Sequence, residues 1–269
     1  MANSPEGKIK RIPLVPTRTK LSMTYILIVV IGFYIASAIF TEAYPNKIIS
    51  GMPIVIDFIV LDLIPPNWSY VDSVLESLIE TWNMALIATT LAAIFGLPIS
   101  FLAAKNINTK NVFYQIVRFV LNILRTIPEL ILAVVFVAFI GLGALAGTMA
   151  LFVFSFGILA KLISETIESI DPHPLEAIRA TGGNIIQVIW YGVMPQILPQ
   201  FVSYALYVFE INVRASVVLG FVGAGGIGLI LKHQLALFNY GNVSTIVVMT
   251  FFAVTIIDFV SNRLRERLL

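Results

Sequence analysis

The sequence predicts an all-α protein, a polytopic transmembrane bundle of about six helices. Hydrophobic residues make up 58% of the chain, charged residues only 12%, and the mean hydropathy is +0.94. A soluble domain of 269 residues needs a far more charged surface. The chain has no cysteine, which excludes disulfides and thiolate metal sites. Its net charge of +2 is too small to suggest a nucleic-acid partner.

Apolar runs long enough to cross the hydrocarbon core define the expected helices. We expect spans at residues 24–40, 82–104, 128–140, 148–162, 197–219 and 243–259. The third could extend backwards through VFYQIVRFVLNIL, residues 112–124. The stretches 111–127 and 219–242 are ambiguous, so five or seven spans stay open.

Lysine and arginine near the span ends predict the orientation in the lipid bilayer. The basic N-terminal segment 1–23 and the basic C-terminal segment 263–269 are expected in the cytoplasm. The first helix, 24–42, leads to an acidic external segment, 43–81, and a core domain follows at 82–262. The cytoplasmic C-terminal arginines are Arg263, Arg265 and Arg267.

A short amphipathic helix is expected just before the second span. Ser73 and Glu76 have the spacing of a capping box, which would start this helix. Its apolar residues recur on one face, at Val71, Leu75, Leu78, Ile79 and Trp82. We interpret it as an interfacial elbow that sets the angle of the second span.

A polar island, DPHPLEAIRATGGNIIQVIWYGVMP, occupies residues 171–195 on the expected cytoplasmic side. Pro174 suits the first position of a helix, and the Gly182–Gly183 pair should end that helix. Asn184 should cap a second helix. Its apolar stripe comprises Ile185, Val188 and Ile189. Two helices this short need a packing surface, either on a partner or on this chain's own spans, and periodicity favours neither.

The island resembles the EAA loop of the permeases of ABC importers. In that family the pattern runs E-A-A, three residues, Gly, nine residues, then I-x-L-P. Glu176, Ala177, Gly182 and Pro195 match it. Departures from the pattern occur at Ile178, Gly192 and Met194.

The resemblance implies a type I ABC importer permease in the bacterial inner membrane. The loop would dock into a cleft of the ATP-hydrolysing subunit. Implied partners are a second copy of the chain, two ATP-binding subunits and an external substrate-binding protein. ATP and magnesium would bind the ATPase subunits, so this chain would hold no cofactor and would not be an enzyme.

Two further stretches resemble the phosphonate importers: FEINVRASVVLGFVGAGGIG, residues 209–228, and QVIWYGVMPQILPQF, residues 187–201. The expected cargo is therefore a phosphonate or a related phosphorus oxyanion. The methionine importers share a VGAGG stretch and an R-[ST]-I-P stretch, so methionine stays an alternative. A secondary transporter without an ATPase should show internal repeats with interrupted helices in both halves, and no second glycine-rich segment is apparent.

A glycine cluster follows the fifth expected span. Gly223, Gly225 and Gly228 spell the dinucleotide-binding fingerprint, but that reading needs a preceding strand and an acid about 20 residues on. A membrane span precedes the cluster and no acid appears before Asp258. With Gly226, the cluster is expected at a gate or an inter-subunit contact, where small residues permit close approach. A tight outer loop is the alternative.

Charged residues inside spans are costly and often functional. Glu210 and Arg214 are four residues apart and can pair, and Arg214 is the clearest cation deep in an expected span. The pair could line the pathway, with Arg214 transiently offsetting an anion, or it could only stabilise the fold. Asp258 is expected to pair with Arg263. We see no residues for a metal site or for catalysis.

Overall fold

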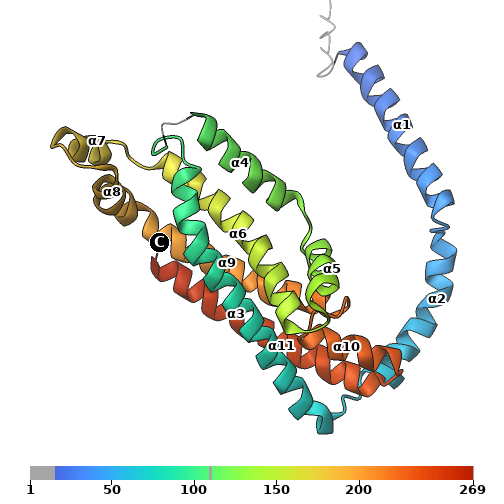
Figure 1. Cartoon of the computed structure of the whole chain (residues 1–269). Coiled ribbons are helices and arrows are strands. Elements are labelled where there is room, and N and C mark those ends of the chain that lie inside the picture. The colour runs from blue at the N-terminus through green and yellow to red at the C-terminus, as the bar shows by residue number, and fades with distance from the viewer. Residues whose placement is uncertain (1–15, 109–110, 269) are drawn as a thin grey trace, which may run out of the picture. The chain divides into compact units, whose positions relative to one another are not determined.

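The computed structural model describes residues 16–108 and 111–268, and every regular element in them is a helix (Figure 1). The prediction of an all-α fold is confirmed. The chain divides into two units, residues 1–60 and 61–269, which are described separately.

The first unit contains α1 (Thr17–Phe40) and α2 (Pro45–Asp57). α1 has 24 residues and exposes large apolar side chains all round, including Tyr25 and Phe33. A helix that is apolar on every side suits the interior of a membrane. α2 continues into a π-helical turn, η1 (Phe58–Leu63), at the boundary of the two units.

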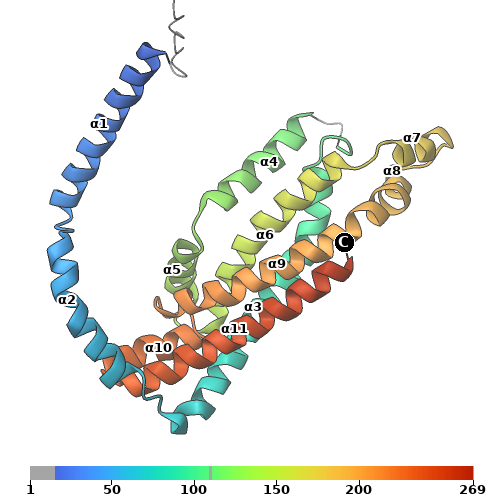
Figure 2. The same cartoon turned by 180° about the vertical axis from the view of Figure 1, so that it is seen from behind.

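The second unit is a bundle of four long helices that pack side by side (Figures 1 and 2). They are α3 (Val71–Leu102), α6 (Ala144–Ser169), α9 (Met194–Gly220) and α11 (Tyr240–Leu268). α3 packs most extensively on α6, through small residues that let the backbones approach. A Cβ added to Gly96 of α3 would lie 3.6 Å from the backbone nitrogen of Ala160.

One span is broken. α4 (Asn111–Thr126) and α5 (Glu129–Ile140) both pack on α6 but meet at an angle of 90°. Pro128 precedes α5 and disfavours a helical conformation of Ile127, which accounts for the break. The described residues contain 5 helices able to cross a membrane, or up to 6 spans if the bent pair counts as one. The expected six agrees with the upper number.

The prediction of a separate elbow helix before the second span was wrong. After a 3-10 turn, η2 (Trp68–Tyr70), α3 runs unbroken from Val71, and Tyr70 precedes it without a side-chain cap. Ser73 and Glu76 already lie in the helix, which contains no glycine or proline before Gly96 to stop it. The buried face comprises Val74, Ser77 and Thr81, whereas the expected apolar stripe is largely exposed at Leu75, Ile79 and Trp82.

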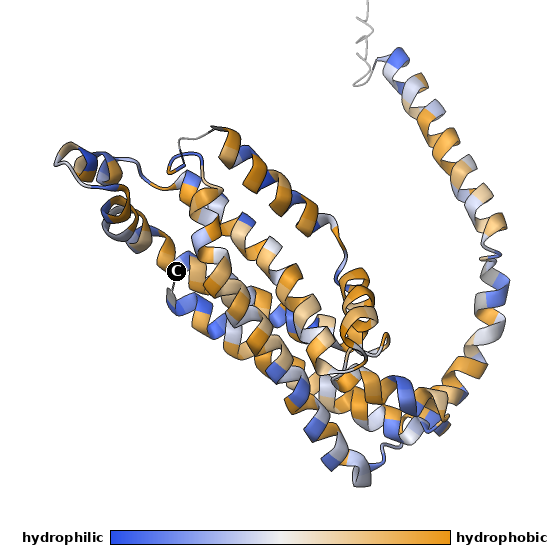
Figure 3. Cartoon of the chain, in the orientation of Figure 1, coloured by the Kyte–Doolittle hydropathy of each residue, from blue (hydrophilic) through white to orange (hydrophobic). Residues whose placement is uncertain are grey.

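The last ambiguous stretch holds α10 (Ile227–Ala236), whose 10 residues are too few to cross the bilayer. α10 lies at the end of the bundle where α3 begins (Figure 1). Figure 3 shows hydrophobic residues dominating α5 and α6, with hydrophilic residues around α7 and at the C-terminal end of α11.

Candidate functional site

The polar island folds into α7 (His173–Ala180), α8 (Ile185–Gln187) and a π-helical turn, η3 (Val188–Val193), that runs into α9. It lies at the same end of the bundle as the start of α4 and the C-terminal end of α11 (Figures 1 and 2). This shared end agrees with the expectation that the polar island and the C-terminal segment lie on one side of the membrane. We call residues 171–195 the coupling loop.

Local sequence explains the shape of the coupling loop. α7 ends at Ala180, and Gly182 has φ +83°, a conformation that side-chain-bearing residues rarely adopt. The expected cap of α8 is confirmed: the Asn184 carboxamide oxygen accepts from the backbone nitrogen of Gln187 at 2.9 Å. The Gln187 side chain accepts from the backbone nitrogen of Asn184 at 2.8 Å, completing a capping box.

The apolar stripe does not form one exposed surface. Val188 is 1% exposed and Ile189 is half-buried, and both pack on this chain's own core with Leu175 and Ile178. Of the predicted stripe, only Ile185 is exposed. The stripe therefore packs mainly on the permease itself, and its use as a docking face was wrong for Val188.

Other large side chains of the coupling loop are exposed instead, among them Ile186 at 72% and Trp190 at 65%. Sequence periodicity missed them because it followed the stripe of Ile185, Val188 and Ile189, whereas Ile186 and Trp190 are four residues apart on another side of the helix. Glu176, in the first turn of α7, and Ala177 are exposed as well. The exposed coupling-loop residues Glu176, Ala177, Ile185, Ile186 and Trp190 are available to a partner; we call them together the loop surface.

The start of the coupling loop is tied down by polar contacts. Gln196 of α9 accepts from the backbone nitrogen of Asp171 at 3.1 Å and donates to the Gly192 carbonyl at 2.8 Å. Asp171 lies 2.6 Å from the His173 ring nitrogen Nδ1. Hydrogen bonds from the backbone and ring of His173 lower the pKa of Asp171, and that carboxylate raises the pKa of His173. Pro195, the last matched residue of the motif, lies exposed in the first turn of α9.

A network of four charges joins α9 to α11. Arg214 pairs with Glu210, as the spacing predicted, and also with Asp258 at 2.7 Å. Arg265 pairs with the second oxygen of Glu210 at 2.6 Å. The expected pairing of Asp258 with Arg263 was wrong, because Arg214 reaches Asp258 from the facing helix. Arg263 lies 3.7 Å from Glu266.

A buried polar triad beside this network was missed. Asn212 is 0% exposed, donates to the Thr89 hydroxyl at 2.8 Å and accepts from the Ser155 hydroxyl at 2.9 Å. It thereby links α3, α6 and α9. The signal that could have revealed it was an asparagine inside an expected span, between Glu210 and Arg214.

The glycine cluster is a buried turn between α9 and α10. Gly223, Gly225 and Gly226 have positive φ, and the Gly223 carbonyl accepts from the Gly143 nitrogen at 2.9 Å. A Cβ on Gly225 would lie 2.7 Å from the backbone of Ala144, and one on Gly228 only 1.9 Å from the Val217 carbonyl oxygen. The turn therefore has the geometry of a tight loop, the alternative that the sequence left open. Its assignment to a gate stays a prediction.

An apolar groove of about 650 Å³ runs between α3, α9 and α11. Its walls include Trp82, Phe209 and Leu264. None of the described residues that line it is charged. The groove offers an anion no compensating charge.

Comparison with known proteins agrees with this geometry. Residues 96–268 match the family model of the binding-protein-dependent transport system inner membrane component. The phosphite transport system permease protein PtxC of Stutzerimonas stutzeri is 39% identical over 221 residues, 82% of this chain and 80% of that protein. The putative cryptic phosphonate transport system permease protein PhnE2 of Escherichia coli is 47% identical over 118 residues, 44% of this chain and 97% of that protein.

The fold is also found in solved structures. A chain of the inward-facing MetNI methionine ABC transporter superposes with a TM-score of 0.69 at 25% identity, covering 76% of this chain and 99% of that chain. The family model covers the broken span, the coupling loop, the charge network and the glycine turn. The chain belongs to the family of binding-protein-dependent transport system inner membrane components.

Proposed function

We propose that the chain is the channel-forming subunit of an ATP-driven importer that carries a phosphorus oxyanion across the bacterial inner membrane. The observation that carries the proposal is the 39% identity to a phosphite permease over four-fifths of that protein. Methionine is the second candidate, supported by the likeness to the methionine transporter at 25% identity. The lower identity makes it the weaker candidate.

An external binding protein delivers the cargo, and separate subunits bind ATP and magnesium and hydrolyse the nucleotide. Two copies of this chain would form the channel above two ATPase subunits, because each copy offers one coupling loop. The coupling loop and both termini would face the cytoplasm. Support for this orientation comes from the arginines near the C-terminal end of α11. That end of α11 lies at the same end of the bundle as α7.

The loop surface is the proposed contact with the ATPase. Ile186 and Trp190 project from a loop that would stand in water, where large exposed apolar side chains commonly mark a binding partner. The exposed carboxylate of Glu176 adds one charge to this surface.

Single cysteines at Ile186 and Trp190 test the contact, since the chain has none of its own. Both should react with a soluble maleimide in the isolated permease and become protected when the ATPase binds. A cysteine at Leu237, 53% exposed at the other end of the bundle, is the matched control and should label equally in both states. Equal labelling of Ile186 and Trp190 with and without the ATPase would show that the coupling occurs elsewhere.

Glu176 tests the role of charge on the same surface. Glu176→Gln keeps the size of the side chain, whereas Glu176→Lys reverses its charge. We expect both to weaken ATP hydrolysis that depends on the binding protein, with Lys the more severe. Unchanged hydrolysis in both variants, with the complex intact, would refute a role for the charge.

A further inference from the structure

Arg125 lies at mid-membrane depth. It belongs to the last turn of α4, immediately before the break at Ile127–Pro128. A Cβ on Gly157 would lie 3.5 Å from the backbone nitrogen of Arg125, and Gly157 is near the middle of α6. Because α6 is long enough to cross the bilayer, Arg125 sits near the centre of the hydrocarbon core.

The charge of Arg125 is not compensated within the described part of the chain. The side chain is exposed and forms no ion pair there. Arg118 of the same helix pairs with Glu168 at 3.0 Å, and Arg214 pairs with two carboxylates. A lone guanidinium facing lipid at this depth is strongly unfavourable, so Arg125 must face water or protein.

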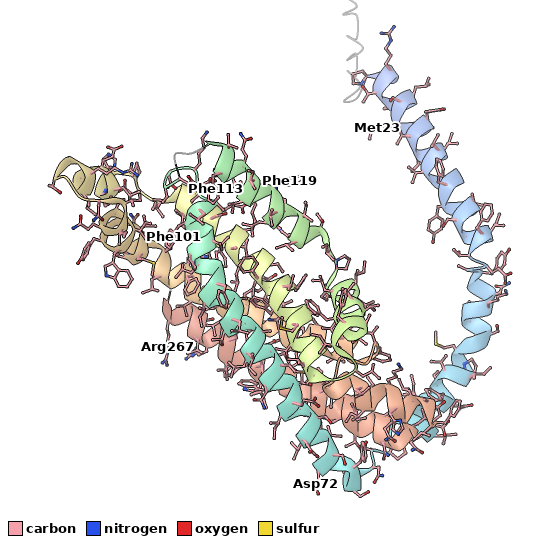
Figure 4. The ribbon with its side chains drawn as sticks, viewed as in Figure 1. Met23, Asp72, Phe101, Phe113, Phe119 and Arg267 are labelled. Carbon is pink, nitrogen blue, oxygen red and sulfur yellow. The ribbon has the colours of Figure 1, made fainter. Side chains whose placement is uncertain are left out.

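The neighbouring side chains favour water. Asn122 and Thr126 are exposed on the same side of α4 as Arg125, at helical spacing. At about 3.6 residues per turn, the exposed apolar residues Phe113 (Figure 4) and Val120 fall on a different side of α4. The break next to Arg125 also interrupts the helical hydrogen bonds, and irregular backbone at this depth occurs only inside protein or along a water-filled cavity.

We propose that the polar face of α4, formed by Asn122, Arg125 and Thr126, lines a water-filled route and that Arg125 compensates the charge of the passing oxyanion. A guanidinium donates two parallel hydrogen bonds to phosphorus oxygens. The apolar groove between α3, α9 and α11 offers nothing comparable. This assignment rests on the proposed function and makes Arg125, not Arg214, the cation of the pathway.

Arg125→Cys tests the proposal within one folded protein. The variant is assembled with its ATPase and binding protein in membrane vesicles, then treated with a cationic or an anionic methanethiosulfonate reagent. Both reagents should react, because the site is wet. Uptake should fall by about tenfold or more in the untreated variant, because the oxyanion loses both charge-assisted hydrogen bonds of the guanidinium. The cationic adduct should restore most uptake, and the anionic adduct should not.

Matched positions on α4 complete the design. Asn122→Cys should label with both charged reagents, whereas Val120→Cys, whose side chain is 47% exposed on the other side of α4, should label with neither and transport normally. Failure of Arg125→Cys to label would overturn the proposal, and so would equal uptake with the two adducts. Labelling does not depend on cargo, so a wild-type complex that carries no phosphorus oxyanion would refute the proposed function alone.

An inter-subunit ion pair is the remaining alternative. Glu129, in the first turn of α5, is the half-buried carboxylate next along the chain and could meet Arg125 of a second copy. In that case Arg125→Glu combined with Glu129→Arg would recover uptake and dimer stability, which would overturn the proposal. We expect the double exchange to transport no better than Arg125→Glu.

Discussion

Removing Arg214 should destabilise the bundle through Asp258 rather than through Glu210. Glu210 keeps Arg265 at 2.6 Å, but the Asp258 oxygen that Arg214 contacts loses its partner. The other Asp258 oxygen is already buried without a hydrogen bond in the described residues. Arg214→Ala therefore leaves an unpaired carboxylate whose side chain is only 29% exposed.

The magnitude lies between two limits. Breaking a fully buried ion pair costs about 3–5 kcal/mol, and breaking an exposed pair about 0–1 kcal/mol. The Arg214 side chain is 51% exposed and that of Asp258 is 29% exposed, so we expect a loss of about 2 kcal/mol. At roughly 2–4 °C per kcal/mol, the melting temperature should fall by about 4–8 °C.

The assay is thermal unfolding of the purified complex in lipid nanodiscs, with three companion variants. Arg214→Ala with Asp258→Asn should recover most of the loss, because asparagine carries no charge. Arg214→Ala with Glu210→Ala should not, because Asp258 stays unpaired and Arg265 loses its carboxylate partner and keeps, among the described residues, only the Ser261 hydroxyl. Arg214→Lys should cost about 1 kcal/mol, since an ammonium keeps the charge but not the planar fork. If Glu210→Ala recovered more stability than Asp258→Asn, the geometry of the network would be wrong.

Three further predictions concern packing, the buried triad and the coupling loop. Gly228→Ala should destabilise the protein by about 2 kcal/mol or more in thermal unfolding, because the added Cβ would lie 1.9 Å from the Val217 carbonyl oxygen. The control Gly32→Ala, which places its Cβ with nothing within 4 Å, should be neutral or stabilising. Asn212→Ala should cost about 1 kcal/mol of stability by the same measurement, because two interhelical hydrogen bonds disappear. If Asn212→Ala were no less stable than the exposed control Thr255→Ala, the triad would be contradicted. Asp171→Asn should lower the pKa of His173 toward its ordinary value of about 6.5 in an NMR titration, and an unchanged pKa would refute the contact. In the wild type, the raised pKa of His173 means that this contact stabilises the folded loop fully below about pH 6.5 and less as the pH rises through the raised value. The lowered pKa of Asp171 means that its share is present above about pH 4 and is lost as the pH falls through the lowered value.

The sequence predicted the helices and their order because hydropathy and the residues that start or end helices, such as glycine, proline and capping residues, are local signals. A few neighbouring residues are enough to predict three features: the polar island between α6 and α9, the end of α7 before Gly182, and the Asn184 cap of α8. The elbow failed because a capping-box spacing within a continuous helix looks the same as one at its start.

Tertiary partners could not be predicted in this way. Asp258 pairs with Arg214 across two helices separated by the whole glycine turn and α10, and no spacing rule relates them. The docking stripe was wrong because periodicity identifies an apolar face but not what covers it: Val188 packs on this chain's own core, and Trp190 is the exposed side chain. The depth of Arg125 became apparent only from its position beside Gly157.

Uptake by proteoliposomes tests the central claim most directly. Vesicles containing this chain and its ATPase are loaded with ATP and magnesium, with the ATP-binding face inside the vesicle and the binding protein outside. Phosphite, phosphate, a phosphonate and methionine are then offered in turn. We expect a phosphorus oxyanion to accumulate only when the ATPase, ATP and the binding protein are all present. Accumulation of methionine alone would contradict the proposed cargo, and accumulation driven by an ion gradient without the ATPase would contradict the mechanism.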